Sequence, residues 1–90
     1  MDVMVGKVTH YYSRLSVAVI DVKGNLEIGD KIEILGKTTE LTQYVTSMEI
    51  EHHKIQSVLP GMEVALQVAE PVRPGDMVYK KVDNARDFMG

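Results

Sequence analysis

The fold of this 90-residue chain is decided by residues 24–34, whose sequence is GNLEIGDKIEI. The pair Gly29-Asp30 is a turn signal, because glycine and short polar side chains favour chain reversal. Charged and apolar residues then alternate over residues 31–35. Strict alternation of this kind places one side of a β-strand towards a core and the other towards water. The stretch therefore predicts a turn followed by a half-buried strand.

Similar short segments, separated by glycine and proline, occur on both sides of this stretch. On the C-terminal side, residues 62–68 alternate in the same way, and residues 77–82 form a last predicted strand. On the N-terminal side, residues 3–11 form a first strand, in which Gly6 indicates a β-bulge or a close backbone approach. In residues 62–68, the side chains expected to face the core are Val64, Leu66 and Val68, and those expected to face water are Glu63, Ala65 and Gln67.

The clearest predicted strand covers residues 13–22, which are rich in valine and other residues that suit a pleated surface. Its side chains divide into two alternating sets, one for each face of the strand. The set expected to face the core is Leu15, Val17 and Val19, and the set expected to face water is Ser16 and Ala18.

Residues 39–49 are consistent with either a helix or a strand. Leu41, Tyr44, Val45 and Met48 have helical spacing, but the segment is rich in threonine and contains no alanine. Threonine loses side-chain freedom in a helix, so a strand is favoured. The chain then has six or seven short strands, which are typical of a β-barrel or sandwich.

A barrel is the better prediction at this length, because closure removes the exposed edges of a small sheet. We expect an all-β fold in which residues 1–82 form one small closed Greek-key-like barrel and residues 83–90 form a short C-terminal tail.

The composition is that of a small globular domain. Of the 90 residues, 44% are hydrophobic and 26% are charged, which argues against disorder. The formal net charge of −3 argues against non-specific coating of nucleic acid. The lack of cysteine excludes a disulfide framework and a thiolate nucleophile. No apolar run approaches the roughly 20 residues of a membrane span, so we expect a soluble cytoplasmic module without a membrane partner.

Four stretches, in this order, resemble the second domain of translational GTPases, the β-barrel that follows the GTP-binding domain in elongation factor Tu and elongation factor one-alpha. They are residues 24–34, 45–50, 59–61 and 72–78. The resemblance implies a translation-type barrel that contacts RNA or a ribosome-associated protein. The chain has no Gly-x-x-x-x-Gly-Lys-Ser/Thr phosphate loop, so neither GTP binding nor GTPase activity is expected.

A second resemblance leads to different biology on a related fold. Residues 42–45 and 71–77 are similar to the accessory C-terminal barrel of collagenase-like peptidases. This resemblance implies an accessory or specificity subunit that pairs with a separately encoded peptidase-like enzyme. A self-associating structural protein, most simply a homodimer, is a third possibility.

Aromatic and basic side chains gather near the end of the first predicted strand. Tyrosine beside arginine can stack on the bases of single-stranded RNA and contact phosphate, and it is also enriched in protein interfaces. A third reading packs one tyrosine in the core and leaves the other half-exposed. The candidate RNA-binding or partner-binding residues are Lys7, His10, Tyr11, Tyr12 and Arg14.

The remaining motifs have structural roles or carry no chemistry. Adjacent His52 and His53 point to opposite faces of a strand, which disfavours a shared metal ion. No serine lies in a Gly-x-Ser-x-Gly motif. We therefore expect no enzymatic activity, no catalytic residues, no cofactor and no metal site. The residues expected to shape turns are Gly29, Asp30, Pro60, Gly61, Pro74, Gly75 and Asp76.

Overall fold

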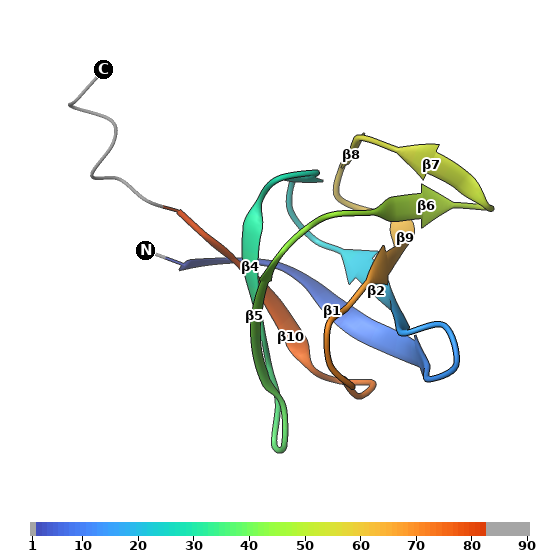
Figure 1. Ribbon diagram of the computed structural model, residues 1–90. Helices are drawn as coiled ribbons and strands as arrows, with labels where there is room; N and C mark the ends of the chain where they lie inside the picture. Colours follow the sequence, from blue (N-terminus) through green and yellow to red (C-terminus); the bar gives the residue numbers. More distant parts are fainter. Residues whose placement is uncertain (1, 83–90) are drawn as a thin grey trace.

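The computed structural model describes residues 2–82, which form β-strands joined by turns and loops (Figure 1). The all-β prediction is confirmed, and no helix in this part of the chain is long and apolar enough to cross a membrane. The predicted C-terminal tail, residues 83–90, lies outside the described residues. The strands are β1 (Asp2–Tyr12), β2 (Val17–Val22), β3 (Leu26–Glu27), β4 (Lys31–Leu35), β5 (Glu40–Tyr44), β6 (Met48–Ile50), β7 (His53–Ile55), β8 (Ser57–Val58), β9 (Glu63–Gln67) and β10 (Met77–Lys81).

Ten strands replace the predicted six or seven, because four of them are only two or three residues long. These four, β3, β6, β7 and β8, lie in the stretch between the turn at Gly24 and the start of β9. Where the sequence left a helix open, the structure has β5 and β6, so the strand prediction is confirmed.

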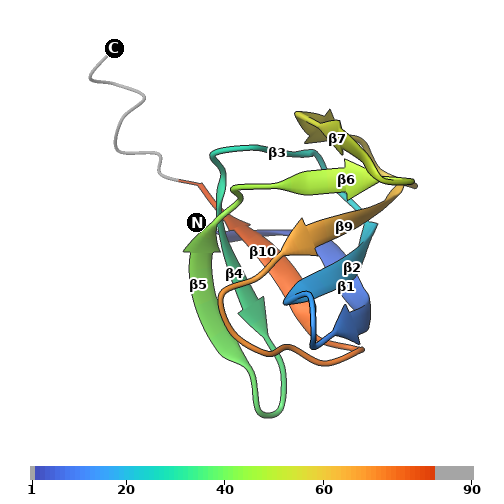
Figure 2. The same cartoon turned by 45° about the vertical axis from the view of Figure 1, so that its right-hand side comes forward.

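Eight strands form one antiparallel sheet in the order β5-β4-β10-β1-β2-β9-β6-β7, and β3 pairs with β8 in a separate small sheet. Figure 2 shows the large sheet curving round, so that β5 at one end comes near the loop that follows β9. Within residues 2–82, the end strands β5 and β7 are not paired with each other. The sheet is therefore not closed by backbone pairing, and the closed-barrel detail of the prediction is not confirmed.

The core lies inside the curve of the sheet. Ile32 and Ile34 of β4 and Val64 and Leu66 of β9 are buried, as their alternation predicted. The other buried hydrophobic residues are Val5, Val8, Ala18, Ile20, Val22, Leu26, Leu41, Val45, Met48, Val58, Val68, Val72 and Val78.

The predicted facing of β2 is wrong by one residue. Ala18, Ile20 and Val22 are buried, whereas Val17 and Val19 are half-buried on the outer face. A one-residue shift moves every side chain of a strand to the other face. Pairing decides the facing, because Ile20 lies opposite Val64 of β9 and Ala18 opposite Leu66. Leu15, also expected in the core, lies in the preceding turn and is 65% exposed.

Gly6 lies at a β-bulge, as the sequence indicated, where the pairing of β1 with β10 shifts between Met4 and Gly6. A Cβ atom there would lie 2.6 Å from Cγ2 of Ile20. A second, unpredicted shift occurs in the pairing with β2 between Val8 and His10. Because a bulge adds one residue to a strand, it changes which later side chains face outward.

Three turns share one geometry, with glycine in the third position. Gly29, Gly61 and Gly75 have φ angles of 95°, 94° and 97°, in the left-handed region that favours glycine. In two of these turns an aspartate follows the glycine. The Asp30 carboxylate accepts a 2.9 Å hydrogen bond from the Glu27 amide, and the Asp76 carboxylate accepts one of 2.9 Å from the Arg73 amide.

Pro60 and Pro74 occupy the second position of two of these turns, where the fixed φ of proline fits. The backbone closes both, from the Met62 amide to the Leu59 carbonyl at 3.3 Å and from the Asp76 amide to the Arg73 carbonyl at 3.1 Å. These hydrogen bonds fix the positions at which β9 and β10 begin.

Candidate functional site

The predicted binding residues of β1 do not share one face. His10 and Tyr12 lie on the outer face with their ring centroids 4.3 Å apart, and Tyr12 is 48% exposed. Tyr11 instead packs against the core. Lys7 is exposed farther back on β1, and Arg14 is exposed in the turn that leads to β2. The structure therefore separates Tyr11 from the other four side chains.

A surface groove begins at Tyr12 and runs across β2, β9 and β6. It consists of two adjoining open hollows with volumes of about 610 Å³ and about 440 Å³. Glu49 and Ala65 line both hollows, so the two hollows adjoin at this pair. We call this surface the outer groove. The lining residues used below are Tyr12, Leu15, Val17 and His52 in the first hollow, Val19, Glu51, Met62 and Glu63 in the second, and Glu49 and Ala65 in both.

Strand pairing explains why the surface is hollow at this point. Ala65 of β9 lies between its partners Val19 of β2 and Glu49 of β6. The Ala65 side chain is a single methyl group, so it leaves a depression between the larger side chains of its neighbours. The floor of the outer groove is therefore apolar, although it lies on the outer face of the sheet.

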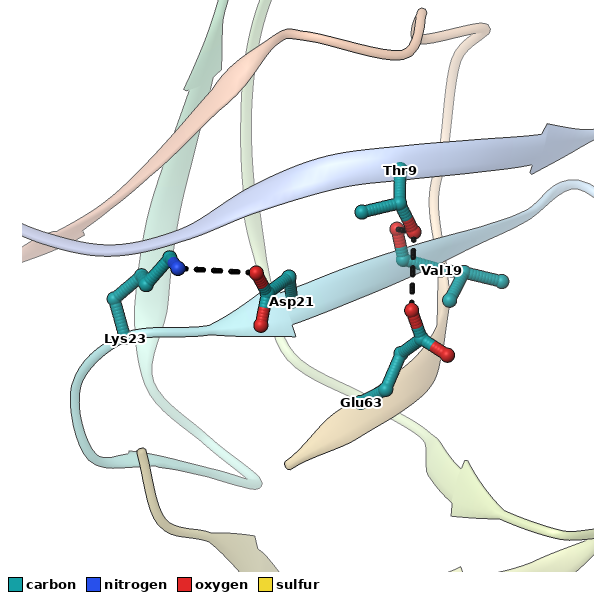
Figure 3. A network of polar contacts seen from close by, with 5 residues as sticks. All are labelled: Thr9, Val19, Asp21, Lys23 and Glu63. Atoms are coloured by element: carbon teal, nitrogen blue, oxygen red, sulfur yellow. Dashed lines mark hydrogen bonds and ion pairs between the residues drawn. The ribbon is translucent and has the colours of Figure 1, made fainter. Parts of the chain in front are cut away.

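The rim of the outer groove carries acidic side chains. Glu49, Glu51 and Glu63 line the second hollow, and none of them has a cationic group within 4.0 Å among residues 2–82. Asp21, two residues after Val19 in β2, differs because its carboxylate pairs with Lys23 at 3.0 Å (Figure 3).

Among residues 2–82, Glu63 has one weak polar contact. The Thr9 hydroxyl lies 3.2 Å from the Val19 carbonyl oxygen and 3.5 Å from a carboxylate oxygen of Glu63 (Figure 3). A hydroxyl has only one proton to donate, and the contact with Val19 is shorter. The carboxylate of Glu63 therefore keeps most of its capacity to accept hydrogen bonds from a partner.

The two-residue turn between β6 and β7 forms the end of this rim. Its residues, Glu51 and His52, have φ angles of 48° and 66°, which are uncommon for residues other than glycine. Ile50 pairs with His53 across the turn, and both φ values are positive as in a type I′ hairpin. His52 thus lies in a turn and not in a strand, and it lines the outer groove.

Metal coordination finds no support in the described residues. No group of three or more His, Asp or Glu side chains within residues 2–82 is arranged to hold a metal ion.

Sequence reasoning missed most of the outer groove, because it assigned Val17 and Val19 to the core. The signal that could have found it is the run of residues 17–20, which is apolar on both faces of the strand. A strand in an antiparallel sheet needs only one apolar face for the core. The second apolar face is therefore an indication of a contact surface.

Comparisons with known proteins identify relatives of this chain. Residues 2–78 match the family described as the Peptidase family U32 C-terminal domain. An uncharacterized protease of Methanocaldococcus jannaschii is 40% identical over 76 residues, which are 83% of this chain and 19% of the relative. A collagenase of Porphyromonas gingivalis is 38% identical over 80 residues, which are 87% of this chain and 19% of the relative.

Solved structures show the same fold. The C-terminal domain of a Geobacillus thermoleovorans putative U32 peptidase superposes with a TM-score of 0.81 at 22% identity, covering 87% of this chain and 91% of that one. GDP-bound aIF5B from Aeropyrum pernix superposes with a TM-score of 0.65 at 14% identity, covering 97% of this chain and 15% of that one. At these identities the similarity concerns the fold alone.

The comparisons correct the first of the two resemblances. The sequence relatives include a protease and a collagenase, and the matching family is the C-terminal domain of a peptidase family. The interpretation of the chain as a translation-related, RNA-binding module is therefore wrong. The U32 peptidase C-terminal domain and aIF5B are both similar to this chain in fold. The turn motifs that shape this fold therefore resembled both the peptidase-type and the translation-type barrel.

Proposed function

Because the chain belongs to the Peptidase family U32 C-terminal domain, we propose that it is an accessory domain that works by binding the peptidase part of a U32 protein. The observation that carries this proposal is the extent of the match. The family covers residues 2–78, yet the chain spans only about a fifth of the length of the curated relatives that it matches. In those relatives, about four-fifths of the protein lies outside the region of similarity.

In this proposal the domain supplies binding and the peptidase part supplies the chemistry. The sequence contains no cysteine and no serine in a nucleophile-elbow motif. The outer groove is an open surface with an apolar floor. Such a surface suits contact with another protein better than the exclusion of water from a reacting bond.

The experiment uses the purified 90-residue chain and the peptidase part of a U32 protein from the same organism, prepared without its C-terminal domain. Calorimetry measures binding between them, and gelatin cleavage is followed for each component alone and for the mixture. We expect binding and faster cleavage in the mixture, with no cleavage by the chain alone. An unrelated β-domain of similar size is the control.

Two results would contradict the proposal. Cleavage of gelatin by the purified chain alone would show that the domain has its own chemistry. Absence of binding to the peptidase part at concentrations up to about 1 mM, the effective concentration that a short linker provides, would remove the accessory role, because a weaker contact would have a free energy of only about −4 kcal/mol.

A further inference from the structure

We propose that the outer groove is the surface that holds the peptidase part, and that the segment it holds carries Lys or Arg beside an aliphatic or aromatic side chain. This inference rests on the proposed function and adds the contact surface and the chemistry of the partner.

The outer groove has an apolar floor. Val17, Val19 and Ala65 lie on the outer face of β2 and β9, where they do not contribute to the core. On β4 and β5 the outward residues are mostly polar. They are Lys31, Glu33, Leu35, Glu40, Thr42 and Tyr44, of which only Leu35 is aliphatic. Removing apolar surface from water is favourable, so a partner that covers the outer face of β2 and β9 gains binding free energy there.

Large apolar side chains also lie at both ends of this floor. Tyr12 and Leu15 border the first hollow and are 48% and 65% exposed, and Met62 borders the second and is 40% exposed. Tyrosine and methionine are enriched at protein interfaces, where they present a large contact area. A segment lying along the outer groove would therefore meet apolar side chains over its whole length.

The rim of the outer groove is acidic. Glu49, Glu51 and Glu63 line the second hollow, and none of them has an ion pair within 4.0 Å among the described residues. Lys54 lies opposite Glu49 in the hairpin, so the rim carries three carboxylates against one nearby ammonium group. An acidic partner would be repelled, whereas Lys or Arg would be attracted and could take up the free carboxylate oxygens. The combination of an apolar floor with an acidic rim selects a partner that is both apolar and basic.

The occupant is assigned from the size of the relatives. The matched region makes up 19% of the Methanocaldococcus jannaschii protease and 19% of the Porphyromonas gingivalis collagenase. The remainder of such a protein is always present beside this domain at high effective concentration. We therefore assign the outer groove to the peptidase part and not to a free substrate or a second copy of the chain.

The test compares variants of the full chain in calorimetric titrations with the peptidase part. Ala65→Arg fills the floor, Leu15→Ser removes an exposed apolar group, and Glu49→Lys combined with Glu63→Lys reverses the rim charge. We expect each to weaken binding about tenfold or more, as substitution of a hot-spot residue does. Higher salt should weaken binding of the parent chain more than that of the charge-reversed variant.

Matched control variants lie outside the outer groove. Thr42→Arg matches Ala65→Arg, Leu59→Ser matches Leu15→Ser because Leu59 is 61% exposed, and Glu40→Lys combined with Glu70→Lys matches the charge reversal. The controls should bind like the parent chain. Circular dichroism and the thermal midpoint verify that every variant is folded. Leu15→Ser changes an exposed turn residue, so it tests the inference even if Ala65→Arg unfolds the domain.

The outcomes separate this inference from the proposed function. If the parent chain binds and the outer-groove variants bind equally well, the groove assignment is wrong and the accessory role stands. If the parent chain does not bind the peptidase part, the proposed function itself fails. If the variants instead lose affinity for gelatin peptides, or lose a homodimer seen in light scattering, the surface belongs to a substrate or a second copy and the assignment is overturned.

Discussion

Asp76 is one of two polar residues buried in the described part of the chain, with only 5% of its surface exposed. One carboxylate oxygen accepts the hydrogen bond from the Arg73 amide, and the other lies against Gly36 in the loop after β4. A Cβ atom on Gly36 would overlap this second oxygen. Gly36 is therefore required by a neighbour that lies 40 positions away in the sequence.

We expect Gly36→Ala to lower the free energy of unfolding by about 2 kcal/mol, because the added methyl group forces either the loop or the buried carboxylate to move. Denaturation by urea, monitored by circular dichroism, measures the change. Lys37→Ala is the control, since Lys37 is exposed and its replacement should change stability by less than about 0.5 kcal/mol. Equal stability of the Gly36→Ala variant and the parent chain would show that this contact is not tight in solution.

The turn motifs show what residue patterns can predict. The turns at Gly29-Asp30 and Gly75-Asp76 were predicted from the sequence, because the hydrogen bonds that fix them span three residues. The dependence of Gly36 on Asp76 was not predicted, because it arises only when distant parts of the chain come together. Local geometry is encoded locally, whereas close approach between elements is not.

At the scale of single strands, the sequence determined facing only where one side of the strand is polar. β4 and β9 alternate charged or polar residues with apolar ones, and both were oriented correctly. β2 is apolar on both faces, so alternation alone could not select between them, and its orientation was wrong. The same ambiguity concealed the floor of the outer groove, which is formed by the outward residues of β2 together with Ala65.

The hairpin of β6 and β7 has a turn that its sequence does not favour. Glu51 and His52 both adopt positive φ, a conformation that costs a residue with a side chain of the order of 1 kcal/mol. We expect His52→Gly to raise the free energy of unfolding by about 1 kcal/mol, since glycine adopts this conformation without a steric penalty. Thermal denaturation measures the gain.

The control for this prediction replaces a neighbouring histidine of ordinary conformation. His53 lies in β7 and is exposed, and it has no positive φ. His53→Gly should therefore destabilise the hairpin, because glycine weakens a strand. If both substitutions lower the thermal midpoint, the positive φ of His52 does not strain the turn, and the prediction is wrong.

For the molecule as a whole, the gap in the curved sheet is bridged by a side chain. The Gln43 amide nitrogen donates a 2.9 Å hydrogen bond to the Gln67 carbonyl, and the Ala69 amide donates one of 2.7 Å to the Gln43 side-chain oxygen. Gln43 belongs to β5, whereas residues 67–69 end β9 and begin the next loop. One amide side chain thus makes both a donor and an acceptor contact, as a paired strand would.

This bridge could not be predicted from the sequence. Alternation and turn signals indicated a barrel, but they carry no information about which edge strands remain unpaired. Closure by backbone pairing requires a strand opposite β5, and the chain after Gln67 turns away into the loop that leads to β10. The bridging role falls to Gln43 because its side chain points inward, between the buried neighbours Leu41 and Val45.

We expect Gln43→Glu to destabilise the domain at neutral pH by about 1–2 kcal/mol, because the carboxylate loses the donated hydrogen bond and faces the Gln67 carbonyl oxygen. Protonation restores a donor, so folding favours the protonated form and raises the pKa of the introduced carboxyl above its unfolded value. The unfavourable contribution is then present at neutral pH and disappears as the pH falls through that raised pKa.

The measurement is urea denaturation of the parent and variant chains at about pH 7 and about pH 4.5, near the ordinary pKa of glutamate. The stability difference between the two chains should shrink at the lower pH. Thr42→Glu adds a carboxyl to the exposed face of the same strand and should show no such recovery.

Hydrogen exchange should report faster loss of the Ala69 amide proton in Gln43→Ala than in the parent chain, since that substitution removes its acceptor. An unchanged exchange rate at Ala69 would mean that the two edges of the sheet are held together by something other than Gln43.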